Sequence, residues 1–191
     1  MRKIILASRS PWRKKILAKA GLRFTVEESG YKENMKMKLA PRVLARRLAL
    51  GKAVAVAARH DDAIVIGADT FVVFRGQLLG KPHTQKRAIR MLKMLNGKTH
   101  TLITGFAIVD SKTDRKVSKA VGTHITMRVL SDEEIVTYVR TGEPLNAAGA
   151  YAIQGRGARL MKKVRGDVNN VAGLPLTELL KELKIMGVLS T

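Results

Sequence analysis

Residues 64–74 read Ile-Val-Ile-Gly-Ala-Asp-Thr-Phe-Val-Val-Phe, an apolar run that a single carboxylate interrupts. β-Branched and aromatic residues of this kind are typical of a central strand. Asp69 lies inside the run, where an unpaired charge is strongly unfavourable. We therefore expect a metal ion or a cationic partner beside Asp69. The plainer alternative is an aspartate that caps the end of a strand.

Two lysines are candidates for the same site. Lys81 stands in Gly80-Lys-Pro82, just beyond a turn at Gly76-Gln77. Lys52 lies in a helix that we expect from Pro41 to about Arg59, and its neighbours three and four positions away are all apolar: Leu48, Ala49, Ala55 and Val56. Lys52 is therefore predicted either to line the buried wall of a cleft or, as the commoner alternative, to extend its ammonium out to solvent.

Composition limits the class of protein. The 191 residues are 46% apolar and contain no cysteine, which predicts a globular chain without disulfides or zinc-thiolate sites. We find no repeat or linker, so we expect one domain over residues 1–191. No apolar stretch is long enough to span a membrane, and the first residues lack the pattern of a signal peptide. A cytoplasmic location is the expectation that follows.

The chain is strongly basic. Its 36 Lys and Arg against 15 Asp and Glu give a net charge of +21, and residues 1–60 hold 16 basic and 3 acidic side chains, or 16 − 3 = +13. Such an excess predicts an anionic ligand: a nucleoside triphosphate, a nucleic acid or an anionic membrane surface. A general bias in surface composition is the alternative. Aromatic residues make up only 4% of the chain and do not alternate with basic ones, which disfavours a single-strand nucleic-acid platform.

Strand and helix patterns alternate along the chain, which predicts an α/β fold with a mixed sheet. The expected strands are 3–7, 22–27, 64–74, 99–109 and 117–129, and the expected helices are 11–20, 41–59, 84–95, 132–140 and 175–186. Ser131 and Glu134 form a capping-box pattern at the start of one helix. The segment 142–173 is rich in glycine and small residues and is predicted to be a loop system near a ligand.

The segment Ser8-Arg-Ser-Pro-Trp-Arg13 joins the first strand to the first helix. Serine hydroxyls, backbone amides and Arg13 at a helix N-terminus are suitable phosphate ligands. The four histidines show no metal-binding spacing, and we interpret them as structural or surface groups. The segment Gly155-Arg-Gly157 is not a dinucleotide fingerprint, since the third glycine is missing.

Several ordered blocks together resemble one protein family, the Maf nucleoside triphosphate pyrophosphatases. The resemblance covers residues 4 to 183 and is specific because the blocks are numerous and well spaced. They are Leu6-Ala-Ser-Arg-Ser-Pro11 with Arg13, Lys52-Ala53, Gly67-Ala-Asp-Thr70, Leu79-Gly-Lys-Pro82, Leu95-Asn-Gly97 with His100, Thr104-Gly105, Gly142-Glu-Pro144, Ala148-Gly-Ala-Tyr151, Gln154-Gly155 and Val171-Ala-Gly-Leu-Pro175.

The resemblance implies an activity and a fold. The expected reaction is metal-dependent hydrolysis of a nucleoside triphosphate to a monophosphate and pyrophosphate, which removes unwanted nucleotides. The expected fold is a mixed twisted sheet flanked by helices, with two lobes around a central cleft as in the inosine triphosphate pyrophosphatases. The resemblance also implies a homodimer and a divalent cation, Mg²⁺ or Mn²⁺. A basic nucleic-acid-binding protein is the alternative from another class.

Roles for individual residues follow from the same resemblance. Asp69 is implied as the catalytic carboxylate that activates water and, together with Glu33, as a metal ligand. Lys52 and Lys81 are implied as catalytic lysines that hold the triphosphate. Ser8 and Arg13 are implied as substrate-binding residues that contact phosphate oxygens.

The resemblance implies that three further positions recognise the base, and these positions indicate different substrates. Trp12 resembles the branch that acts on 7-methyl-GTP, where the tryptophan face stacks on a cationic purine. Thr70 and Gln154 resemble the branch that acts on dTTP and UTP, where the glutamine amide pairs with a uracil-type edge. Two markers of three favour dTTP, UTP and modified pyrimidine nucleotides as substrates, with 7-methyl-GTP as the alternative.

Overall fold

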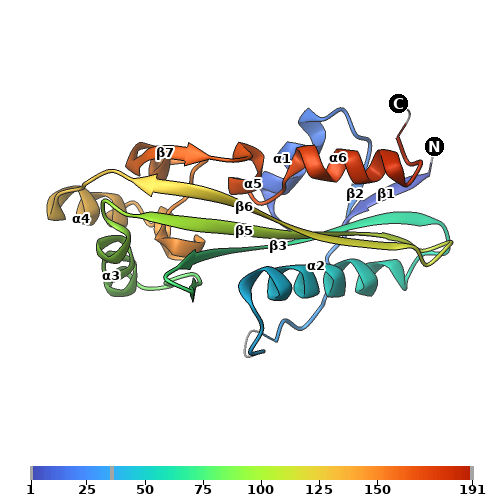
Figure 1. Cartoon of the computed structure of the whole chain (residues 1–191), viewed down its shortest axis with the longest axis horizontal. Coiled ribbons are helices and arrows are strands. Elements are labelled where there is room, and N and C mark those ends of the chain that lie inside the picture. Colours follow the sequence, from blue (N-terminus) through green and yellow to red (C-terminus); the bar gives the residue numbers. More distant parts are fainter. Residues whose placement is uncertain (1, 35–36, 190–191) are drawn as a thin grey trace.

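A mixed β-sheet runs through the centre of the molecule (Figure 1). The structure is a computed structural model that describes residues 2–34 and 37–189. Within them the strand order is β2-β1-β3-β5-β6-β7, with β4 beside β3. The strands are β1 (Lys3–Leu6), β2 (Thr25–Val26), β3 (Ala63–Phe74), β4 (Gln77–Leu79), β5 (Thr99–Asp110), β6 (Lys116–Met127) and β7 (Met161–Arg165). β1 is parallel to β2 and β3, and the other pairs are antiparallel.

Helices cover both faces of this sheet. α2 lies along one face, whereas α1 and α6 lie on the opposite face and α3 and α4 pack at one end (Figure 1). The helices are α1 (Pro11–Lys19), α2 (Pro41–Ala57), α3 (Gln85–Leu95), α4 (Asp132–Arg140), α5 (Val168–Val171) and α6 (Leu176–Ile185). The predicted α/β class with a mixed sheet is therefore confirmed. Every helix in the described part of the chain is too short or too polar to span a bilayer.

The predicted elements match well except in two segments, the first of which is the strand predicted at residues 22–27, where only Thr25–Val26 form a strand. The capping box at α4 is present, since Glu134 N donates to Ser131 Oγ and Ser131 N donates to Glu134 Oε2. The prediction that residues 142–173 form only loops was wrong, because they include β7, α5 and three short 3₁₀ helices: η1 (Glu143–Asn146), η2 (Ala148–Ala150) and η3 (Arg156–Leu160). β7 is an edge strand of mostly exposed residues, so the sequence carries no apolar alternation there.

One edge of β3 is left open between two neighbouring strands. β5 pairs with the other edge from Ile64 to Val73. On the open side β1 pairs with residues 63–66 and β4 with residues 72–74. Both strands run toward the gap, so the chain leaving β1 and the chain leaving β4 converge on residues 67–71. The fold thereby places the Asp69 segment at a break in the strand pairing of the sheet.

α2 packs against the sheet at unusually short range because glycines lie beneath it. A Cβ atom on Gly105 would lie 2.2 Å from the backbone of Ala45, and one on Gly67 would lie 2.3 Å from the Ala49 carbonyl oxygen. Gly105 is also the direct register partner of Asp69. The absent side chains therefore bring the backbone of α2 next to the carboxylate.

The far end of the sheet holds a buried histidine. His100, on β5, forms a 2.7 Å hydrogen bond with the Tyr151 hydroxyl. Burial lowers the pKa of His100 to about 4, and no described residue hydrogen-bonds its Nδ1 atom. His100 is thus a neutral structural group, in agreement with its interpretation from the sequence.

The contact between α2 and the sheet predicts that Gly105→Ala is strongly destabilising. The new methyl group meets backbone atoms of Ala45 that move only if the helix moves, so we expect a loss of about 3 kcal/mol in the free energy of unfolding. Urea denaturation measures it. Gly122→Ala in β6 is the matched control, since its methyl group meets the flexible end of Arg42, and we expect a loss below about 1 kcal/mol. Equal losses would contradict close helix packing as the cause.

The neutral state of His100 predicts a loss of stability in acid. Its folded pKa of about 4 lies below the unfolded value of 6.5, so the unfolded chain binds more protons as the pH falls between these values. We expect this group to remove about 2 kcal/mol of stability between pH 7.5 and pH 5. Thermal denaturation at the two pH values should show a smaller change for His100→Gln than for the unaltered protein. An identical pH dependence in the two proteins would mean that His100 is charged in the fold.

Candidate active site

A lysine and two carboxylates meet at the open edge of β3. The ammonium of Lys52, on α2, forms an ion pair with Asp69 Oδ1 and lies 2.8 Å from Glu33 Oε1. The side chains of Lys52 and Asp69 are 12% and 9% exposed, whereas that of Glu33 is 40% exposed. Lys52 therefore lines the buried wall of a cleft, which excludes the alternative that it extends freely into solvent.

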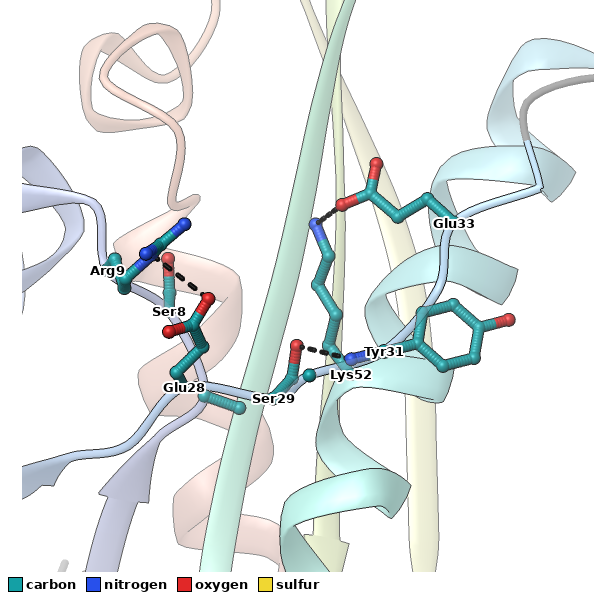
Figure 2. Close-up of a pocket in the computed structure, with 9 residues that line it drawn as sticks. Ser8, Arg9, Glu28, Ser29, Tyr31, Glu33 and Lys52 are labelled. Atoms are coloured by element: carbon teal, nitrogen blue, oxygen red, sulfur yellow. Dashed lines mark hydrogen bonds and ion pairs between the residues drawn. The ribbon is translucent and has the colours of Figure 1, made fainter.

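Glu33 reaches this pair from the irregular segment that follows β2. Tyr31 anchors the segment, because its ring packs directly against Gly51 of α2. A Cβ atom on Gly51 would lie only 2.4 Å from this ring. Figure 2 shows Lys52 directed toward Glu33, with Ser8 and Arg9 across the pocket. The pocket has a volume of about 290 Å³, and its lining residues are Ala7, Ser8, Arg9, Glu28, Ser29, Gly30, Tyr31, Glu33 and Lys52.

On the opposite face of β3, Arg13 organises a second set of polar groups. Its guanidinium donates to the Gly173 carbonyl oxygen at 2.8 Å and to the hydroxyls of Ser8 and Thr70 at 3.1 Å each. Burial lowers the pKa of Arg13, while the negative charges of Asp69 and Glu33 oppose that shift. An arginine side chain stays protonated in proteins, so a fixed positive charge lies beside the Ser8 hydroxyl.

Alternation along β3 brings the two sets together. Asp69 and Thr70 are adjacent residues of one strand, so their side chains leave opposite faces of the sheet. Asp69 meets α2, and Thr70 meets Arg13 of α1. Thr70 Oγ1 also lies 3.1 Å from Thr104 Oγ1 on β5. The two sets of polar groups therefore lie on opposite faces of the same unpaired stretch of β3.

Asp69 has the properties of a proton acceptor. Burial raises its pKa, and the positive charges of Lys52 and Arg13 oppose this without reversing it. Its second oxygen, Oδ2, is buried and receives no hydrogen bond from any described residue. A buried carboxylate oxygen without a partner is uncommon, and it is free to accept a proton or bind a cation.

The same residues fit a divalent cation. Asp69 and Glu33 both direct an oxygen at one ammonium group, so two carboxylates already converge on a single positive charge. Mg²⁺ is commonly held by one or two carboxylates together with substrate phosphates. Within residues 2–34 and 37–189 no cluster of three or more His, Cys, Asp or Glu forms a complete metal cage. The two carboxylates would therefore form only part of the coordination shell of a divalent cation.

The remaining predicted residues are Lys81, Trp12 and Gln154, which make no described contact with this cluster. Lys81 is exposed and lies two residues beyond Leu79, on the chain that runs from β4 toward the gap. Trp12, on the first turn of α1, is partly exposed, and the Lys15 ammonium lies 4.7 Å from its ring centroid. Gln154 is partly buried between η2 and η3. Among the described contacts, none joins these three side chains to Asp69.

The structure adds residues that the sequence did not single out. Glu28, Ser29 and Tyr31 line the pocket, and the Arg9 guanidinium lies 3.2 Å from the Glu28 carboxylate. These residues belong to a polar segment that resembles any surface loop. Only the packing of Tyr31 on Gly51 reveals that the segment forms a wall of the site.

Comparison with known proteins shows which family this chain resembles over its length. The family model for Maf-like proteins matches residues 3–186. Proteins named dTTP/UTP pyrophosphatase from Moorella thermoacetica and Geobacter metallireducens are each 47% identical to this chain over 98% of it and 97% of their own length. The enzyme of that name from Methanosarcina mazei is 44% identical over 98% of this chain and 96% of its own.

A solved structure supports the fold alone. A HAM1 protein from Coxiella burnetii aligns with 97% of this chain and 100% of its own, with a TM-score of 0.52 and 13% identity. The sequence matches carry the family assignment, since they extend over nearly the whole chain at more than 40% identity. This chain belongs to the Maf family.

Proposed function

We propose that this protein hydrolyses dTTP and UTP to the corresponding monophosphates and pyrophosphate. The observation that carries the proposal is the buried carboxylate of Asp69, which lies on the unpaired stretch of β3 within the electrostatic reach of Lys52, Arg13 and Glu33. The names of the relatives agree with this reaction, and so do the basic groups around the gap.

The residues suggest how the reaction proceeds. Asp69 accepts a proton from water, and the resulting hydroxide oxygen bonds to the α-phosphorus while the bond from this phosphorus to the bridging oxygen breaks. Pyrophosphate carries away the electrons of the broken bond. Lys52 and Arg13 neutralise charge that develops on the phosphoryl oxygens. A divalent cation held by Asp69 and Glu33 supplies further neutralisation when bound.

Ser8 and Lys81 complete the proposed phosphate contacts. The Ser8 hydroxyl is held by Arg13 at the end of β1, and Ser10 caps α1, whose N-terminus carries a partial positive charge. Lys81 has an exposed ammonium on the opposite side of the gap. A triphosphate that spans the gap would thus meet positive groups from both converging chains.

The surroundings of Trp12 favour a pyrimidine over 7-methyl-GTP. The Lys15 ammonium already lies over the tryptophan ring, where a positively charged purine would be repelled. A neutral uracil or thymine ring meets no such repulsion. Gln154 has the amide needed to pair with the uracil edge, and none of the described residues hydrogen-bonds that amide.

A panel of nucleotides tests the substrate directly. We expect dTTP and UTP to yield monophosphate and pyrophosphate in the presence of Mg²⁺ or Mn²⁺, measured by separating the nucleotides and assaying pyrophosphate and orthophosphate independently. Release of orthophosphate without pyrophosphate would contradict cleavage at the α-phosphate. Preferred cleavage of 7-methyl-GTP would overturn the proposed base specificity.

Asp69→Asn tests the proposed base. The amide cannot accept the proton, so we expect turnover of dTTP to fall by at least about 100-fold. Glu33 still pairs with Lys52 in this variant, and we expect the fold to persist by circular dichroism. Asp114→Asn is the matched control, because Asp114 is exposed and pairs with Lys116, and the activity of this variant should be unchanged. Normal turnover in Asp69→Asn would remove the proposed base.

A further inference from the structure

A glutamate and a tyrosine hold both ends of the loop that carries Gln154. The Tyr138 hydroxyl, on α4, donates to Glu143 Oε1 at 2.7 Å. The backbone amides of Arg156 and Gly157 donate to the same carboxylate at 2.9 Å each. At the other end of the loop, the amide of Ala152 donates to the Tyr138 hydroxyl at 3.2 Å. We call Tyr138 and Glu143 the clamp.

Glycines allow the loop to lie directly on the clamp. A Cβ atom on Gly155 would lie 2.4 Å from Glu143 Oε2, and one on Gly157 would lie 2.6 Å from the Tyr138 hydroxyl. Both positions therefore need glycine for the backbone to reach the carboxylate and the hydroxyl. Ile153 packs against the core, and the polar contacts of the loop are shaped around these two side chains.

The clamp is a specific electrostatic contact. Burial opposes ionisation of Glu143, but the hydrogen bonds from Tyr138 and from the two backbone amides outweigh that effect and lower its pKa. The carboxylate accepts three hydrogen bonds in all. Hydrogen bonds to a charged acceptor are stronger than neutral ones, so removing the charge or the hydroxyl weakens several contacts together.

The clamped loop follows a segment that packs beside the proposed active site. A Cβ atom on Gly149 would lie 2.8 Å from the Val72 side chain, and Gly149 N donates to the Gly80 carbonyl oxygen at 3.2 Å. Val72 and Thr70 lie two residues apart on the same face of β3. The segment that leads into the Gln154 loop is therefore anchored on the face of β3 that carries Thr70.

We propose that Glu143, together with Tyr138, is a positioning residue that fixes Gln154 for recognition of the pyrimidine base. This inference rests on the proposed function, because it assigns the selecting group of the same site. Among the described residues Glu143 hydrogen-bonds with Tyr138, Thr141, Arg156 and Gly157, none of which is assigned to the phosphates. Its loss should therefore weaken base selection and leave the binding of phosphate groups unchanged.

Two nearly isosteric variants test the proposal. Tyr138→Phe removes one hydroxyl from a side chain whose ring stays packed in the core, and Glu143→Gln removes the charge. Glu133→Gln is the control, since Glu133 is an exposed glutamate on the same helix, α4, outside the clamp. Hydrogen exchange measured by mass spectrometry reports the order of residues 152–157, with β5 as the internal reference.

Kinetic measurements separate recognition of the base from binding of the phosphate groups. For dTTP and UTP we expect KM and the inhibition constant of the product monophosphates to rise about 10-fold in both clamp variants, while kcat changes less than 2-fold. The preference for dTTP over CTP and GTP should shrink by a similar factor. The inhibition constant of inorganic pyrophosphate, which has no base, should stay the same. Exchange in residues 152–157 should accelerate, and that in β5 should not.

Different results would show that the positioning role is wrong and that the proposed function is wrong. If the unaltered protein hydrolyses none of the triphosphates, the proposed function is wrong. If it hydrolyses dTTP and the clamp variants keep the same base preference, the positioning role is wrong. Unchanged hydrogen exchange in residues 152–157 also overturns it, as does an equal loss of affinity for pyrophosphate.

Discussion

The whole arrangement depends on how closely α2 approaches the sheet. Gly67 and Gly105 have no side chains to hold the helix away, so the backbone near Ala45 and Ala49 lies directly over β3. Lys52 then has only a short distance to span before its ammonium meets Asp69. Either charge alone would be very unfavourable at this depth, and the pair is tolerated because each ion replaces part of the water that the other has lost.

The break in pairing along β3 leaves this buried contact beside an unpaired strand edge. A central strand normally has neighbours along both edges, which would enclose Asp69 completely. Here β1 ends before the carboxylate and β4 ends after it, so one edge of residues 67–71 stays free of strands in the described structure. Adjacent side chains of β3 leave opposite faces, so one short segment presents Asp69 to α2 and Thr70 to Arg13. A single strand thereby joins two polar networks.

The excess positive charge is consistent with an anionic substrate. In the first third of the chain all three acidic side chains are already paired, Glu27 with Arg59 and His60, Glu28 with Arg9, and Glu33 with Lys52. Most basic side chains of this region have no such partner among the described residues. Most of the excess positive charge of this region is therefore unpaired among the described residues, and its field would attract an anionic substrate of the kind proposed.

The sequence by itself determined the α/β class, most helix boundaries, the unusual positions of Asp69 and Lys52, and the family resemblance. These follow from periodicity, capping residues and local motifs, all of which act over a few neighbouring residues. Tertiary structure decided the rest. β7 is an exposed edge strand without an apolar pattern, the wall around Tyr31 depends on a glycine in a distant helix, and the clamp joins Tyr138 to a loop that follows it in the chain. Such contacts depend on which backbones approach one another in space, and no local pattern of residues specifies that.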